Sequence, residues 1–98
     1  MSYRLIVRIE AETDIQTAYF RYENEVPGLG VQFLNAVDDG FNRISDNPLH
    51  YAIIVGGIRR KLVAKFPYGL FFIFEENEVR VLSALQQARN PTLWGRRK

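Results

Sequence analysis

The residues best suited to chemistry in this chain are the cations of its C-terminal half, which can bind an anionic ligand or an acidic protein surface. Three of them, Arg59, Arg60 and Lys61, are consecutive, and Lys65 follows in the same alternating run. Four further candidates stand near the end of the sequence: Arg89, Trp94, Arg96 and Arg97. Arginine offers a planar fork of N–H donors to carboxylates and phosphates, and tryptophan often anchors protein interfaces. These residue types predict binding by charge complementarity, although the three consecutive cations also suit a solubilising strand end and Trp94 also suits packing over a sheet.

Catalytic and metal chemistry have little support in the sequence. The only histidine, His50, has no neighbouring acid or nucleophile and reads as a surface or capping residue. Cysteine is absent, which excludes disulfides and thiolate chemistry and argues against a zinc site. The paired acids Asp38-Asp39 and Glu75-Glu76 lack matching partners, so we interpret them as solvated. We expect neither a metal nor a cofactor.

The charge is divided unevenly along the chain, although the net charge is only +2. Residues 1–50 hold four Arg and Lys against eight Asp and Glu, whereas residues 51–98 hold nine against three. This division predicts a basic surface built by the C-terminal half, able to attract an anionic partner. A solvated sheet face with excess cations is the alternative explanation.

A length of 98 residues predicts a single domain, residues 1–98, with one hydrophobic core. The first residues lack the apolar core of a signal peptide, and no apolar run approaches the roughly 18–20 residues of a membrane span. We therefore expect a cytoplasmic protein without membrane contact.

The elements that must position the cations follow from hydrophobic periodicity. Residues 3–9 are β-prone, and residues 10–25 change to helical spacing. A second helix follows the break at Pro27-Gly28, and it ends near Pro48. Its apolar stripe consists of Phe33, Leu34, Val37, Phe41 and Ile44. The short connection between the two helices predicts an αα-hairpin.

The second half of the chain reads as three strands, over residues 58–66, 70–75 and 78–85. In the first of them Leu62, Ala64 and Phe66 alternate with the cations, and the second is an almost unbroken aromatic run. We predict an α+β fold: a strand, an αα-hairpin, then a three-stranded antiparallel meander packed on the hairpin. The expected buried residues include Leu62, Phe72, Phe74 and Val81.

Four stretches of the sequence follow one another in a characteristic order: residues 10–22, 33–48, 58–85 and 88–97, the last of which reads ARNPTLWGRR. Together they resemble the RelE/ParE toxin superfamily of bacterial toxin–antitoxin modules. The final stretch is similar to an ending in Ala-Arg-Asp-Pro, then Trp, then basic residues. The resemblance covers nearly the whole chain and implies the α+β fold predicted above.

The resemblance implies one of two activities. ParE-like members bind and poison DNA gyrase without catalysis, whereas RelE-like members are ribosome-dependent endoribonucleases that cut mRNA. The nuclease uses strand lysines, an arginine early in the next strand, a late arginine and a C-terminal tyrosine. Lys61, Lys65 and Arg89 match part of this set, but Gly69 and Trp94 stand where the early arginine and the tyrosine are expected. Many relatives also carry a histidine where Gln86-Gln87 stands here.

The missing groups favour the ParE-like, non-enzymatic activity over the ribonuclease. The resemblance further implies a cognate antitoxin with an acidic, disordered C-terminal segment, which would fold over an apolar groove and the adjacent cations. A toxin–antitoxin hetero-oligomer follows from that pairing. DNA gyrase is the expected target, and the ribosome with its mRNA is the alternative.

Overall fold

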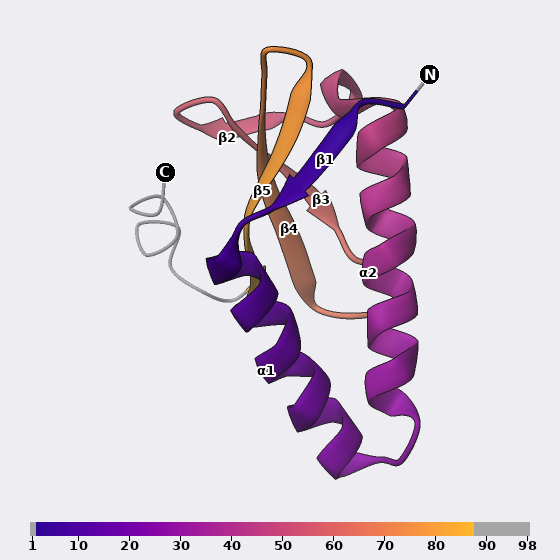
Figure 1. Ribbon diagram of the computed structural model, residues 1–98. Helices are drawn as coiled ribbons and strands as arrows, with labels where there is room; N and C mark the ends of the chain where they lie inside the picture. Colours follow the sequence, from indigo (N-terminus) through magenta and orange to yellow (C-terminus); the bar gives the residue numbers. More distant parts are fainter. Residues whose placement is uncertain (1, 88–98) are drawn as a thin grey trace.

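The computed structural model describes residues 2–87, which form two α-helices and a five-stranded sheet (Figure 1). Strand β1, Arg4–Val7, leads into helix α1, Ile9–Glu25, and helix α2, Leu29–Asp46. A 3-10 turn, η1, Pro48–His50, connects the helices to the remaining strands. These strands are β2, Ile53–Val55, β3, Ile58–Leu62, β4, Tyr68–Glu75, and β5, Glu78–Gln86. The predicted α+β class and the order of strand, helical hairpin and meander are confirmed.

The sheet has the strand order β1-β5-β4-β3-β2, with β1 parallel to β5 and every other pair antiparallel. Strand β2 was not predicted. It pairs with β3 through a hairpin whose two loop residues, Gly56 and Gly57, have φ of 51° and 80°. This left-handed conformation suits the twist of a two-residue hairpin, and glycine adopts it without steric cost. The Gly-Gly pair is the sequence signal for this hairpin.

The two helices form an antiparallel hairpin whose turn is held by one side chain of α1. The carboxylate of Glu23 accepts hydrogen bonds from the backbone N–H groups of Gly28, at 2.8 Å, and Gly30, at 2.9 Å. These N–H groups lie at the start of α2, where the helix supplies no acceptors of its own. Glu23 therefore links the end of one helix to the beginning of the next.

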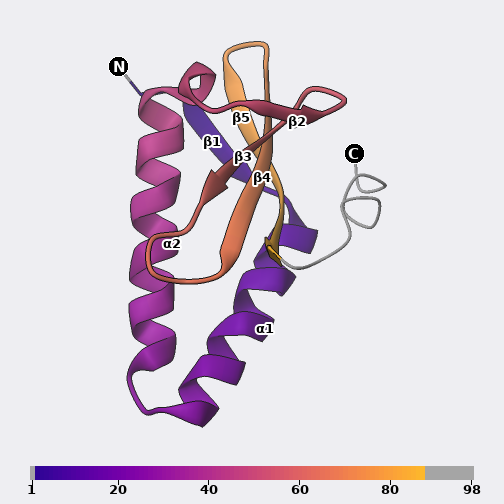
Figure 2. The same cartoon turned by 180° about the vertical axis from the view of Figure 1, so that it is seen from behind.

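The main hydrophobic core lies between the helical hairpin and one face of the sheet (Figures 1 and 2). Phe33 and Ile44 of α2 and Phe72 of β4 are completely buried there. An aromatic cluster joins α1, α2 and the start of β4: the Phe33 ring lies 5.3 Å from Tyr22 and 5.2 Å from Tyr68. Such edge-on and tilted contacts stabilise a core beyond simple area burial.

The opposite, helix-free face of the sheet carries a second, smaller apolar cluster. Ile58, Phe71, Leu82 and Leu85 form it, and each is at most 6% exposed. Two residues of β5, Leu82 and Ser83, occupy the place of one in the β4–β5 ladder, which is a β-bulge. The hydroxyl of Ser83 is buried and, among the residues described, has no hydrogen-bond partner.

The prediction that Leu62 is buried is wrong. Strand β3 ends at Leu62 instead of reaching residue 66, and the Leu62 side chain is 44% exposed. Side chains do alternate along this stretch as predicted. The residue that belongs to the main core, however, is Val63, which points to the opposite side from Leu62. Phe72 and Val81 are completely buried as predicted, whereas Phe74 is only partly buried.

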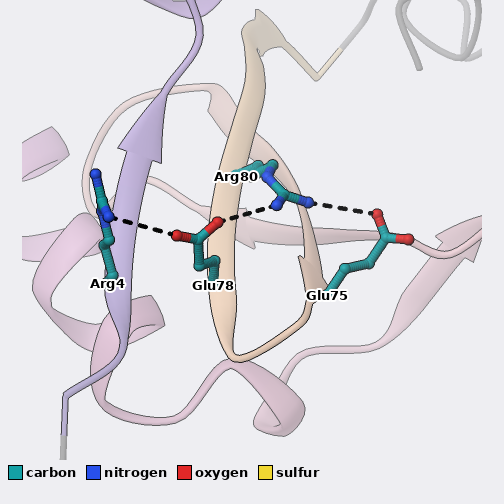
Figure 3. A network of polar contacts seen from close by, with 4 residues as sticks. All are labelled: Arg4, Glu75, Glu78 and Arg80. Atoms are coloured by element: carbon teal, nitrogen blue, oxygen red, sulfur yellow. Dashed lines mark hydrogen bonds and ion pairs between the residues drawn. The ribbon is translucent and has the colours of Figure 1, made fainter.

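The end of the sheet that carries the β4–β5 turn is polar. A chain of ion pairs runs across three strands, from Arg4 through Glu78 and Arg80 to Glu75 (Figure 3). The closest contact in it is 2.9 Å, between Arg80 Nη2 and Glu78 Oε1. Glu75 was interpreted as solvated, and here it is an exposed member of this network. Neither helix of residues 2–87 is long and apolar enough to cross a membrane.

Candidate functional site

The three consecutive cations of β3 do not form one patch, because successive residues of a strand point to opposite faces. Arg59 and Lys61 pair with Phe72 and Leu70, both in the main core, and so lie on the helix-covered side. Arg60 pairs with Phe71 of the second cluster and lies on the helix-free face. The strand therefore offers a single exposed cation to that face and two to the other.

Arg59 and Lys61 are both held by Tyr51, the residue that follows η1. Arg59 Nη1 donates a hydrogen bond to the Tyr51 carbonyl at 2.6 Å, and Lys61 Nζ lies 5.8 Å from the centroid of the Tyr51 ring. Burial raises the pKa of the Tyr51 hydroxyl, which opposes its use as a base near neutral pH. Tyr51 thus contacts two cations of β3, and Lys61 Nζ also donates a hydrogen bond to the Leu62 carbonyl at 2.9 Å.

Arg60 lies across Gly69 on the helix-free face. A Cβ atom at Gly69 would stand 3.2 Å from Cγ and Cδ of Arg60 and 3.2 Å from the Phe71 ring. A side chain here would push the Arg60 stem and the Phe71 ring by a few tenths of an ångström, so Gly69 allows their close approach. The RelE-like pattern has an arginine where Gly69 of β4 stands in this chain. Here the arginine beside that position is Arg60 of β3.

Lys65 was expected on the basic strand but lies in the turn between β3 and β4. Its φ is 68°, and the turn is closed by a hydrogen bond of 3.4 Å from the Phe66 N–H to the Val63 carbonyl. Lys65 is exposed and does not continue the row of Arg59 and Lys61. The other predicted site residues, Arg89, Trp94, Arg96 and Arg97, lie outside the described residues.

His50 is exposed at the end of η1, where its ring meets Tyr51 edge-on with 5.0 Å between the centroids. This placement agrees with the interpretation as a surface residue. Within residues 2–87, no group of three or more His, Asp or Glu side chains is arranged to hold a metal ion.

Sequence reasoning missed an arginine-centred cluster at the opposite end of the sheet from the ion-pair network. Arg21 of α1 donates a hydrogen bond through Nη2 to the Tyr68 hydroxyl at 2.6 Å. With the Gln86 amide oriented so that its oxygen faces the guanidinium, this oxygen accepts from Nη1 and Nη2 at 2.9 Å each. The sequence signal was that Arg21 is the one basic residue within α1, among five acids.

A second missed feature is an apolar groove of about 420 Å³ between α1, α2 and β1. Phe20 and Leu34 line it and remain 56% and 38% exposed. Leu34 was expected in the apolar stripe of the second helix, and that stripe extends beyond the core into this groove. Exposed aromatic and aliphatic side chains gathered in a hollow are typical of a protein-binding surface.

The groove is surrounded by acidic helices. Together α1 and α2 contain eight Asp and Glu against two arginines. Glu12 lies in the lining itself. The resemblance implied an apolar groove next to the basic strand. The residues that line this groove come from β1, α1 and α2, and none of them belongs to β3.

Comparison with known proteins gives a structural match. No family model matches the sequence, and no curated protein matches it. Among solved structures, the chain is similar to one in the chromosomal ParDE TA system from P. aeruginosa. The TM-score is 0.77 at 16% sequence identity, and the match covers 87% of this chain and 96% of the other. The fold predicted from the RelE/ParE resemblance is thus the fold of a chain in a ParDE system.

Proposed function

We propose that this chain is the toxin of a type II toxin–antitoxin module of the ParE type, working in the cytoplasm as a single domain. The observation that carries the proposal is the shared fold, which covers almost the whole of a chain from a ParDE TA system. A shared fold does not by itself determine activity. The four sequence stretches that resemble the superfamily supply a second, independent argument.

The arrangement of the cations supports target binding over RNA cleavage. A nuclease needs several cations and a proton-transfer group converging on one phosphate. Here Arg60 lies on one face of the sheet, Arg59 and Lys61 on the other, and Lys65 in a turn. Tyr68 carries a hydroxyl, but the side chain is 5% exposed and the hydroxyl accepts from Arg21. We propose DNA gyrase as the protein target.

A cognate antitoxin is part of the proposal. The apolar groove beside Phe20 and Leu34 is suited to the apolar side of an amphipathic helix, and the separate cations of β3 are suited to acidic side chains. An antitoxin that wraps from one to the other would contact both, and a toxin–antitoxin hetero-oligomer would result.

The proposed working surface consists of the basic strand and the basic end of the sequence. Its residues are Arg59, Arg60, Lys61, Lys65, Arg89, Trp94, Arg96 and Arg97. Growth arrest should weaken modestly when one exposed strand cation is removed and more strongly in Arg89→Ala, because an arginine fork can bind two acceptors at once. Undiminished arrest by Arg89→Ala, Trp94→Ala and a chain truncated after Pro91, each shown to be folded, would move the surface elsewhere.

The experiment for the proposed function is controlled expression of the chain in bacterial cells. We expect growth arrest with an SOS response and altered plasmid supercoiling, while mRNA stays intact. Co-expression of the neighbouring reading frame should restore growth. Codon-specific mRNA cuts that disappear in Lys65→Ala would replace the gyrase assignment with the ribonuclease.

A further inference from the structure

Arg21 reaches from the C-terminal part of α1 to the end of the sheet and is fixed there by neutral groups. Its guanidinium donates to the Tyr68 hydroxyl and the Gln86 amide oxygen, at 2.6 Å and 2.9 Å. It also lies 5.2 Å from the centroid of the Tyr22 ring and 5.6 Å from that of Tyr68. Rings and neutral acceptors orient a guanidinium without cancelling its charge.

The helical hairpin contains a direct contrast in Arg43. Arg43 is also an exposed arginine on a helix, but its Nε donates to the Asp39 carboxylate at 2.8 Å. This contact raises the pKa of Arg43 and offsets its charge locally. Within residues 2–87, no carboxylate forms an ion pair with Arg21. Of the two arginines in the helices, Arg43 forms an ion pair and Arg21 forms none with a described residue.

Arg21 borders a cavity of about 110 Å³ between α1 and the end of β5. Thr17 and Gln86 give it polar walls, while Ala18 and Leu85 give it apolar ones. This space is large enough to admit several water molecules or one carboxylate with its methylene. The Tyr68 side chain behind the guanidinium is almost completely buried, so the cation has a rigid support.

The geometry points to Arg21 as the anchor for an Asp or Glu side chain of a partner protein whose segment crosses α1 beside β5. A guanidinium fixed by neutral acceptors still has N–H donors left, since the three contacts to Tyr68 and Gln86 use at most three of five. Charge-assisted arginine–carboxylate bonds are among the strongest hydrogen bonds in proteins.

A phosphate group fits this cavity less well than a carboxylate. Asp14 also lines the cavity, where its Oδ2 accepts a hydrogen bond from the Ala84 N–H at 3.0 Å. A second carboxylate in the same space repels a dianion more than a monoanion.

Titration followed by NMR tests the site on the full chain. The probe is N-acetyl-glutamate N-methylamide, and its neutral isostere N-acetyl-glutamine N-methylamide is the comparison. We expect the glutamate probe to shift the Arg21 Nε–H and the amides of Thr17 and Gln86, with weakening as salt increases. Equal shifts from the glutamine probe, stronger binding of inorganic phosphate, or no shift at all would each overturn the proposal.

Variants separate the site from general surface effects. Arg21→Gln should weaken probe binding about tenfold or more, since it removes the charged donor, whereas the matched control Arg43→Gln should leave binding unchanged. Gln86→Glu supplies a carboxylate to Arg21 within the chain, and it should abolish probe binding while the fold is kept. Probe binding that persists in Gln86→Glu would contradict the assignment even if Arg21→Gln does not fold.

The identity of the partner as an antitoxin rests on the proposed function, but the site does not. Carboxylate binding at Arg21 in a chain that causes no growth arrest would keep the site and remove the toxin assignment. Growth arrest by a chain that does not bind the glutamate probe would support the toxin assignment and contradict the site at Arg21.

Discussion

The two faces of the sheet differ in what covers them and therefore in what their side chains can do. On the helix-covered face, Phe33, Ile44 and Phe72 are enclosed between α2 and the strands. On the helix-free face, a four-residue cluster lies between the ion-pair network at one end and Arg60 over Gly69 near the other. We expect the larger core on the covered face to contribute most of the free energy of unfolding. The smaller cluster on the helix-free face should contribute less, and this face also presents charged side chains to a partner.

The largest expected effect is on the covered face. Phe33→Ala removes a completely buried ring that contacts Tyr22, Phe66 and Tyr68. The change should lower the free energy of unfolding by about 3–5 kcal/mol, because it leaves a cavity in the core. Urea denaturation followed by circular dichroism measures it. A loss below about 1 kcal/mol would mean that the aromatic cluster is not the centre of stability.

A smaller effect is expected from the cluster on the helix-free face. Leu82 is 2% exposed, so Leu82→Ala should cost about 2–3 kcal/mol, at the lower end for a buried leucine, because fewer side chains surround it. Leu62→Ala is the matched control. Leu62 is 44% exposed, and its truncation should change stability by no more than about 0.5 kcal/mol. If the two leucine variants lost equal stability, the distinction between the cluster and its surroundings would be wrong.

The smallest effect should have the opposite sign. Ser83 buries a hydroxyl with no hydrogen-bond partner among the described residues, at the bulge of β5. Replacing it with alanine removes an unsatisfied polar group at little cost in volume. Ser83→Ala should therefore leave the stability unchanged or raise it by up to about 1 kcal/mol in the same denaturation assay. A clear loss would show that the hydroxyl has a partner in solution.

Periodicity predicted the helices well because each buries one side against the sheet, and a 3.6-residue repeat records that directly. It predicted the alternation of β3 but assigned the wrong side to the core. The pattern of Leu62, Ala64 and Phe66 was extended through Lys65, where the strand has already ended in a left-handed turn. The short strand β2 was missed because three apolar residues give too little pattern without attention to Gly56-Gly57.

The candidate site was less predictable than the fold for a physical reason. Three consecutive cations in sequence separate onto two faces once they form a strand, so adjacency in sequence did not mean a shared patch. Tyr68 and Gln86 pair at the open end of the β4–β5 hairpin, whereas Arg21 lies 47 residues before Tyr68, and none of the three belongs to a local motif. Only the packing of α1 against the ends of β4 and β5 brings them together.

The most direct test of the toxin assignment is a reaction of the purified chain with purified DNA gyrase and relaxed plasmid. We predict that supercoiling is inhibited and that gyrase-linked DNA breaks accumulate, while mRNA on translating ribosomes remains uncut by the same preparation. Unimpaired supercoiling together with codon-specific mRNA cleavage would contradict it.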